Sequence, residues 1–198
     1  MRKIQLIILP LLLSSFVLYL SFDTQLWITF WRALNIPAVI PPFSDLDSIT
    51  KTLLSKSYGY DVYLENPYDP AHGVYMYPSI WLSVFDFLNL NNINNFRIFN
   101  FIIILIYFFV IQDIYLRNSQ NISKFILIIF FFSTTNFLIL ERLNIEIIIF
   151  SLIYFAVISR NYIFKSPLFL FALAGKVFPI FSIFLFIANK RFFYLILF

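Results

Sequence analysis

Long apolar runs separated by short polar segments constrain this chain more than any other feature of its sequence. Hydrophobic residues make up 61% of its 198 residues and charged residues 12%, a balance outside the range of water-soluble globular domains. A bilayer core contains no water to pair with backbone polar groups, which favours helices. At about 20 residues per crossing, the sequence predicts an all-α integral membrane protein with about five to seven transmembrane or broken helices. A long outer loop with amphipathic juxtamembrane helices completes the predicted fold.

The basic residues predict the orientation of these helices. Eight of the 14 fall into four pairs beside apolar runs: Arg2/Lys3, Arg117/Lys124, Arg160/Lys165 and Lys190/Arg191. Cytoplasmic loops carry an excess of Lys and Arg, so these segments and the N-terminus are expected in the cytoplasm. No small-residue cleavage site follows the first run, which predicts an uncleaved anchor. Trp27, Phe30 and Trp31 are expected to form an aromatic belt at the outer interface.

The chain is expected to form a single membrane domain over residues 1–198. Its predicted parts are a first span at 4–22, an outer loop at 32–75, an interfacial helix at 76–90 and the remaining helices at 96–198. The run at 166–188 is predicted to break between Gly175 and Pro179, because a continuous span would bury Lys176 near the bilayer centre. The final run after Arg191 is too short to span, which predicts a chain truncated at its C-terminus.

The outer loop is predicted to begin with an amphipathic helix on the membrane surface. Ser44 and Asp47 have the spacing of a capping box, and Gly59 stands where such a helix would end. Apolar residues recur three and four positions apart at Leu46, Ile49 and Leu53. The following segment, "NPYDPAHG", contains turn-forming Asn-Pro and Asp-Pro steps.

The candidate functional residues are ionisable groups that the predicted topology places on the outer side, where such groups at a membrane edge are functional candidates. Each also has a structural interpretation. Asp45 and Asp47 could cap a helix. Arg142 and Glu146 could form a local i,i+4 ion pair, and His72 could be a solvated loop residue. For Lys176, which has apolar neighbours on both sides, the structural and the functional interpretation both stay open.

Several classes of function are excluded or disfavoured by the composition. The chain has no Cys, so thiolate metal sites and Cys nucleophiles are excluded. No Gly-rich phosphate loop, HExxH or GxSxG motif is present. The net charge of +4 is explained by the cytoplasmic basic pairs, and nucleic acid is not an expected partner.

Five short motifs, in their order along the chain, carry a resemblance to a known family. They are Ser44-Asp45-Leu46, Asn66-Pro67-Tyr68, Tyr75-Met76-Tyr77-Pro78, Arg142-Leu143-Asn144-Ile145-Glu146 and Lys176-Val177-Phe178-Pro179. Their order resembles the N-terminal part of the GT-C superfamily of membrane glycosyltransferases, in particular the bacterial polyprenol-phosphate mannosyltransferase-like branch. The resemblance covers nearly the whole chain but about half of a typical member. Leu143 stands where the family usually has Gly, and Ser79 where a second Pro is common.

This resemblance implies an enzyme of the bacterial inner membrane that transfers a sugar from a polyprenyl-phosphate donor to an extracytoplasmic acceptor, with inversion at the anomeric carbon. The early loop acid of the family corresponds to Asp45, the expected catalytic base, with Asp47 in reserve. Lys176, Arg142 and His72 are expected to face the donor phosphate. The other expected substrate contacts are Tyr77 and Trp81, which would pack against the sugar or the prenyl chain, and Glu146. Some relatives use a divalent metal and others do not, so cofactors stay undetermined.

A second interpretation comes from another class of protein. The charges could serve only to orient a non-catalytic multi-span protein, such as a transporter, a flippase-like unit or a scaffold, that works with a companion membrane chain. Transporters commonly carry internal repeats with paired broken helices. The sequence contains one such predicted break and no repeat, which favours the enzyme.

Overall fold

The computed structural model describes residues 2–70, 73–117, 121–159 and 161–176, and within these ranges its regular elements are all helices. They are α1 (Arg2–Leu20), α2 (Thr24–Ala33), α3 (Ser44–Ser57), α4 (Ser79–Phe87), α5 (Ile93–Arg117), α6 (Asn121–Phe131), α7 (Thr134–Arg142), α8 (Glu146–Ile158) and α9 (Tyr162–Gly175). The described ranges contain no strand, so the all-α part of the prediction is confirmed.

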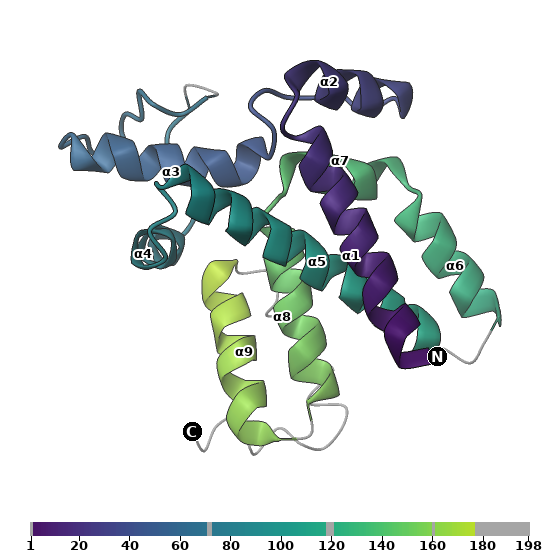
Figure 1. Cartoon of the computed structure of the whole chain (residues 1–198). Coiled ribbons are helices and arrows are strands. Elements are labelled where there is room, and N and C mark those ends of the chain that lie inside the picture. The colour runs from purple at the N-terminus through teal and green to yellow at the C-terminus, as the bar shows by residue number, and fades with distance from the viewer. Residues whose placement is uncertain (1, 71–72, 118–120, 160, 177–198) are drawn as a thin grey trace.

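The upright helices, which run roughly alongside one another, are α1, α5, α6, α8 and α9, and α2 and α3 lie across one end of the group (Figure 1). α1 packs along α5, α5 contacts α8, and α8 and α9 form an antiparallel pair. α2 and α3 lie across the upper end, with α4 packed against α3. The N-terminal ends of α1, α6 and α9 and the C-terminal ends of α5 and α8 lie toward the opposite end. The helices therefore alternate in direction.

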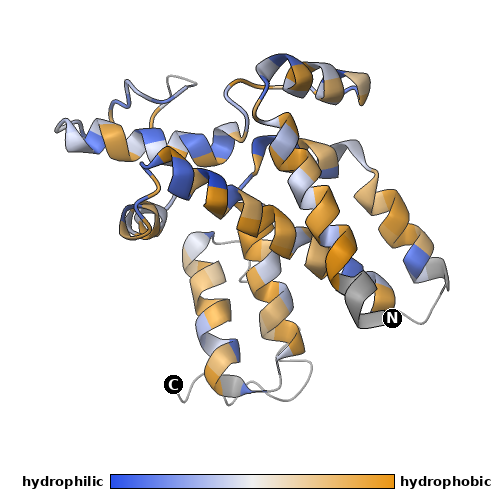
Figure 2. Ribbon diagram, viewed as in Figure 1, coloured by the Kyte–Doolittle hydropathy of each residue, from blue (hydrophilic) through white to orange (hydrophobic). Residues whose placement is uncertain are grey.

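Hydropathy follows this division. Hydrophobic residues predominate along α1, α6, α8 and α9, whereas hydrophilic residues gather on α3 and on the irregular segment that follows it (Figure 2). Many large apolar side chains on the upright helices are exposed, including Leu12, Phe125 and Phe164. Exposed apolar surface on this scale is typical of a protein that contacts lipid or another protein.

Within the described residues, one helix is long and apolar enough to cross a membrane by itself, and this is α5 with 25 residues. Up to three crossings result if each bent helix pair counts as one span. These pairs are residues 7–20 of α1 with α2, bent by 117°, and residues 123–131 of α6 with α7, bent by 50°. α8 and the part of α9 from residue 163 are apolar but shorter than 18 residues. Five to seven spans are therefore not supported.

The helix predicted at the start of the outer loop exists as α3, but its N-terminus differs from the prediction. The N-cap is Phe43, in the left-handed conformation with φ of 62°, and it makes no side-chain capping bond. The predicted capping box of Ser44 and Asp47 is therefore wrong. Leu46 and Ile49 share one face of the helix, as the spacing predicted, but this face is buried in the protein core rather than turned to a membrane surface. The helix ends at Ser57, close to the predicted Gly59, whose φ is 88°.

The predicted aromatic belt is also wrong in its placement. Trp27 and Trp31 in α2 are buried at 0% and 2% exposure rather than displayed at a surface. The Trp27 ring meets the edge of Trp31 and of Phe43, with centroids 5.4 and 5.0 Å apart. Aromatic pairs of this edge-to-face kind add about 0.5–1.5 kcal/mol beyond their buried area. These rings therefore fasten α2 to the segment that leads into α3.

The predicted break after Gly175 is described only in its first half. α9 ends at Gly175, and Lys176 is extended, with φ of −159° and ψ of 147°. The remaining residues of the predicted break, 177–179, lie outside the described residues, as does the predicted helix that would follow.

Candidate functional site

Three helix ends are joined by contacts between polar residues of distant motifs. They are the N-terminal end of α3, the corner between α7 and α8, and the C-terminal end of α9. The contacts that join them are Asn144 with Asp45, 99 residues apart, and Lys176 with Glu146, 30 residues apart. We call these four residues the polar cluster.

Asn144 links the carboxylate of Asp45 to the backbone of Glu146. Its side-chain amide nitrogen, Nδ2, donates a hydrogen bond of 2.6 Å to Oδ2 of Asp45. Its Oδ1 accepts a hydrogen bond of 3.0 Å from the backbone N–H of Glu146, the first residue of α8. One side chain therefore aligns Asp45 with the start of α8. Asn144 belongs to a motif that the sequence singled out, but no functional role was predicted for it.

Lys176 forms an ion pair with Glu146, with Nζ 2.6 Å from Oε1. The two side chains are 28% and 41% exposed, so the pair lies at the edge of the protein rather than in its core. The predicted i,i+4 pair between Arg142 and Glu146 is wrong, because the chain is not helical from Leu143 to Ile145. Arg142 instead lies beside Glu141, with Nε 3.9 Å from Oε2.

The corner that separates α7 from α8 depends on Leu143. This residue is left-handed, with φ of 49° and ψ of 55°, and its side chain is fully buried. Glycine adopts this conformation without the steric cost that other residues incur. In this chain the buried Leu143 side chain offsets the backbone cost by packing.

Asp45 is a half-buried carboxylate with both positively and negatively charged side chains nearby. Burial raises its pKa above the ordinary value, and the nearby Glu146 raises it further. The hydrogen bond from Asn144 and the positive charges of Arg142 and Lys176 act in the opposite direction. Burial prevails, so the ionised carboxylate is more basic than one in water.

Tyr77, a predicted substrate contact, lies close to the same charges. Burial raises the pKa of its hydroxyl to about 12, and the neighbouring Asp45 and Glu146 contribute in the same direction. At neutral pH this hydroxyl is therefore protonated and can donate a hydrogen bond. The structure thus brings together five predicted residues: Asp45, Tyr77, Arg142, Glu146 and Lys176.

Asp47 has a different environment from Asp45. Its Oδ1 accepts a long hydrogen bond of 3.4 Å from the Thr50 hydroxyl. Its Oδ2 is buried and has no hydrogen-bond partner among the described residues. Burial raises its pKa, and Lys51 partly opposes this shift. Asp47 makes no described hydrogen bond to the α7–α8 corner, so the two aspartates are not equivalent.

The Asn66-Pro67-Tyr68 motif holds the irregular segment against α3. The Asn66 amide nitrogen donates 2.8 Å to the Thr52 hydroxyl, and its oxygen accepts from Ser55. Tyr68 stacks on Tyr58, with ring centroids 5.3 Å apart. These contacts shape the loop and leave the motif outside the polar cluster. The neighbouring candidate His72 lies outside the described residues.

Trp81, another predicted substrate contact, is buried at 1% exposure. Its indole N–H donates 3.0 Å to the carbonyl oxygen of Gly175. A Cβ atom at Gly175 would lie 2.7 Å from the Trp81 ring, so a side chain does not fit there. Trp81 therefore fixes the end of α9 and, with it, the position of Lys176.

Glu141 is a buried carboxylate beside the polar cluster for which no role was predicted. Its exposure is 0%, and its Oε1 accepts hydrogen bonds from the Val39 backbone N–H at 2.7 Å and the Trp27 indole N–H at 3.3 Å. The sequence offers one signal, a charged residue at the end of an apolar run. Its partners, more than 100 residues away, could not be read from the sequence.

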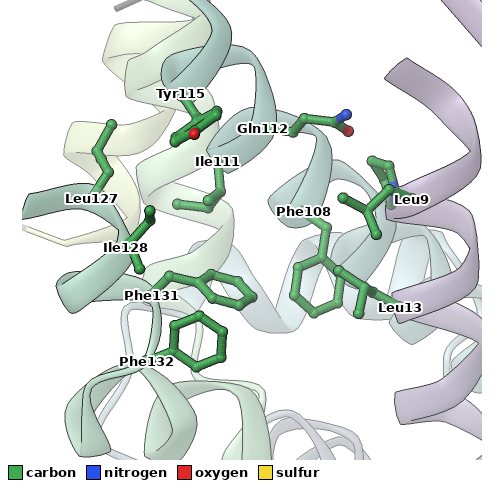
Figure 3. Close-up of a pocket in the computed structure, with 11 residues that line it drawn as sticks. Leu9, Leu13, Phe108, Ile111, Gln112, Tyr115, Leu127, Ile128, Phe131 and Phe132 are labelled. Carbon is green, nitrogen blue, oxygen red and sulfur yellow. The ribbon is translucent and has the colours of Figure 1, made fainter. Parts of the chain in front are cut away.

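Two apolar cavities lie between the upright helices. One of about 210 Å³ lies between α1, α5 and α6, with walls that include Leu13, Phe108 and Phe131 (Figure 3). A second of about 220 Å³ is lined by Tyr107, Phe150 and other apolar residues, with Glu146 as its charged residue. The second cavity reaches the polar cluster through Glu146, and an apolar cavity beside such a cluster suits a ligand with a hydrocarbon chain and a polar head.

The described residues contain no group of three or more His, Cys, Asp or Glu side chains that could hold a metal ion. Comparisons of the chain with protein-family models, curated proteins and solved structures find no match.

Proposed function

We propose that this protein is a membrane-embedded glycosyltransferase of GT-C type that transfers a sugar from a polyprenyl-phosphate donor to an acceptor outside the cytoplasm. The observation that carries this proposal is the environment of Asp45. Its carboxylate is half-buried, has a raised pKa, is aligned by Asn144 and lies within the field of Arg142 and Lys176. A base with nearby cations is the arrangement that such a transfer requires.

In the proposed reaction, the oxygen of an acceptor hydroxyl attacks the anomeric carbon of the donor sugar. The hydroxyl proton passes to Asp45, the new glycosidic bond forms, and the bond from the anomeric carbon to the phosphate oxygen breaks. Polyprenyl phosphate leaves with the electron pair of that bond, and attack from the opposite face inverts the anomeric carbon. A raised pKa makes Asp45 a stronger base toward the acceptor hydroxyl.

The cations of the site act on the leaving phosphate. Arg142 and Lys176 both lie close enough to Asp45 to lower its pKa. A donor sugar held between Asp45 and these two cations would therefore have its phosphate on the cationic side. Lys176 is paired with Glu146, at an edge that is partly exposed. The donor phosphate would share Lys176 with Glu146 or displace it. Tyr77 would donate its hydroxyl proton in a hydrogen bond to a sugar oxygen.

The proposed location is the bacterial cytoplasmic membrane, with the N-terminus in the cytoplasm and the polar cluster on the outer side. Two observations support a multi-pass arrangement. The upright helices alternate in direction (Figure 1), and their surfaces are rich in exposed apolar side chains. The basic residues Arg117 and Lys165 belong to helix ends away from the polar cluster, as a cytoplasmic face requires.

The decisive experiment compares Asp45→Asn with Asp47→Asn in a transfer assay whose donors are polyprenyl phosphates that carry mannose or glucose. Asn keeps the shape of Asp45 and can still accept the hydrogen bond from Asn144. We expect Asp45→Asn to lower the transfer rate roughly 100-fold or more, the usual scale for loss of a general base. Asp47→Asn serves as the matched control and should keep most of the activity.

Lys176→Met supplies the donor-binding arm of the same experiment. It removes the charge but keeps an extended side chain, and we expect weaker binding of the donor with unchanged membrane insertion. Full transfer by both Asp45→Asn and Lys176→Met would overturn the proposal. A non-catalytic multi-span protein, working with a companion chain, would then be the remaining interpretation.

A further inference from the structure

Glu141 has the environment of a residue that organises its surroundings rather than one that meets a ligand. It is completely buried, and both donors to its Oε1 come from the N-terminal part of the chain, Val39 and Trp27. Its Oε2 is buried with no hydrogen bond among the described residues and faces Arg142, 3.9 Å away. A buried carboxylate is costly unless its contacts repay the loss of water.

The two donors to Glu141 lead directly to the start of α3. Val39 belongs to the segment that ends at Phe43, the N-cap residue, and Asp45 follows two positions later. The Trp27 ring also packs on Phe43, with centroids 5.0 Å apart. The Phe43 carbonyl in turn accepts backbone hydrogen bonds from the first turn of α3 at 3.0 and 3.1 Å. A continuous set of contacts therefore connects Glu141 with the backbone that carries Asp45.

The same end of α7 holds the other side of Asp45. Asn144 stands three residues after Glu141 and donates to the Asp45 carboxylate. The end of α7 thus holds α3 at two points, through the backbone before Asp45 and through the Asp45 side chain itself. Loss of the first point would leave the hydrogen bond from Asn144 to hold Asp45 at the end of α7 without the backbone attachment.

We infer that Glu141 is a positioning residue that sets Asp45 against Asn144 and Arg142 by fastening the segment before α3 to the end of α7. Its effect on sugar transfer rests on the proposed function. Its effect on the segment from Ile36 to Phe43 does not, because the hydrogen bond from Val39 exists whatever reaction the protein performs. The two effects can therefore be measured separately.

The first measurement is hydrogen exchange of residues 36–50 in the protein reconstituted in lipid nanodiscs. Glu141→Leu removes the acceptor and should speed exchange of the Val39 amide by about tenfold or more. Glu141→Gln keeps an oxygen acceptor and should exchange as the wild type does. Ser151→Ala is the matched control, since Ser151 is buried and donates within its own helix to Ile147.

The second measurement is the transfer rate of the same variants. We expect Glu141→Leu to lower kcat roughly tenfold to a hundredfold with unchanged KM for the donor, since a misplaced reacting group slows the chemical step. Glu141→Gln should restore the rate to within about threefold, because an amide oxygen fulfils the same hydrogen bonds. Trp27→Phe, which removes the weaker donor and keeps a ring, should have a smaller effect than Glu141→Leu.

The outcomes distinguish the inference from the proposed function. Absence of transfer in the wild type would refute the proposed function, while exchange at Val39 would still test the fastening role. Wild-type exchange in Glu141→Leu would overturn the inference. So would a Glu141→Gln variant as inactive as Glu141→Leu with normal exchange, since the charge would then matter and not the position. If Glu141→Leu fails to fold, Glu141→Gln and Trp27→Phe still decide the outcome by the same readouts.

Discussion

Two groups of charged residues occupy opposite ends of the molecule and are built differently. Away from the polar cluster, Asp113 and Arg117 form an ion pair of 2.6 Å within one turn of α5, and Tyr154 of α8 also hydrogen-bonds to Asp113. The Arg117 side chain is 63% exposed. The polar cluster instead joins residues 30 and 99 positions apart and keeps Asp45 half-buried.

This difference shows which contacts have a positional effect. An exposed pair within one helix contributes little to stability and can be replaced by water. A contact between distant segments fixes two helix ends relative to each other, and its loss displaces whatever they carry. The Arg117–Asp113 ion pair is of the first kind, whereas the contacts of the polar cluster, like the hydrogen bond from Tyr154 to Asp113, are of the second.

In the proposed topology the two ends lie on opposite sides of the membrane, which is the strongest contrast between them. The chain has no Cys, so single cysteines can be introduced at Ser57 in α3 and at Asn161 before α9. In intact cells, a membrane-impermeant maleimide should label position 57 and leave position 161 unlabelled until the membrane is opened. Both positions are exposed in the structure, so differences in burial do not explain the expected result. Labelling of position 57 from the cytoplasm alone would place the polar cluster on the wrong side for the proposed reaction.

A smaller effect is expected within the polar cluster from Asn144→Ala. The hydrogen bond from Asn144 lowers the pKa of Asp45, so its removal should raise that pKa further. Because a base acts in its ionised form, the acidic limb of the kcat/KM profile should move to higher pH. We expect roughly a tenfold loss of transfer at pH 6 and a smaller loss at pH 8, the size of one lost hydrogen bond to a charged group.

The control for this change is Asn95→Ala. Asn95 donates 3.1 Å to the carbonyl oxygen of Asn89, a local contact away from Asp45. Its pH profile should match the wild type. An unchanged profile in Asn144→Ala would mean that the hydrogen bond to Asp45 has no role in transfer.

The smallest effect is expected at the other end, from Arg117→Met. The ion pair with Asp113 is local and exposed on the Arg117 side, so the melting temperature should stay within about 2 °C of the wild type. The transfer rate should not change. Thermal unfolding and the transfer assay measure the two quantities, and a loss of transfer like that of Asn144→Ala would remove the distinction between the two ends.

Local patterns in the sequence determined several of the helices, among them α3, α4 and α5, but not the separate helix α2 or the bend between α6 and α7. The remaining helices were predicted to begin at residue 96, and α5 begins at Ile93; the periodic apolar positions after Ser44 define the buried face of α3. The chain order of the motifs also led to Asp45, Arg142, Glu146 and Lys176. These features are readable because helical periodicity and capping depend on residues three or four apart.

Other features depended on tertiary structure. The capping box failed because Phe43, held by Trp27, takes the N-cap position in a left-handed conformation. Trp81 proved to be a buried support for Gly175. Side-chain identity alone does not say whether an aromatic residue packs inside the protein or faces a ligand.

The sequence by itself therefore determined that the chain is helical and rich in apolar residues, and it determined which charged residues could carry chemistry. Only the tertiary structure decided their partners: Asn144 for Asp45, Lys176 for Glu146, and Val39 for Glu141. The reason is physical. Helix formation is governed by neighbours along the chain, whereas a hydrogen bond between residues 30 to 102 positions apart depends on how whole helices pack.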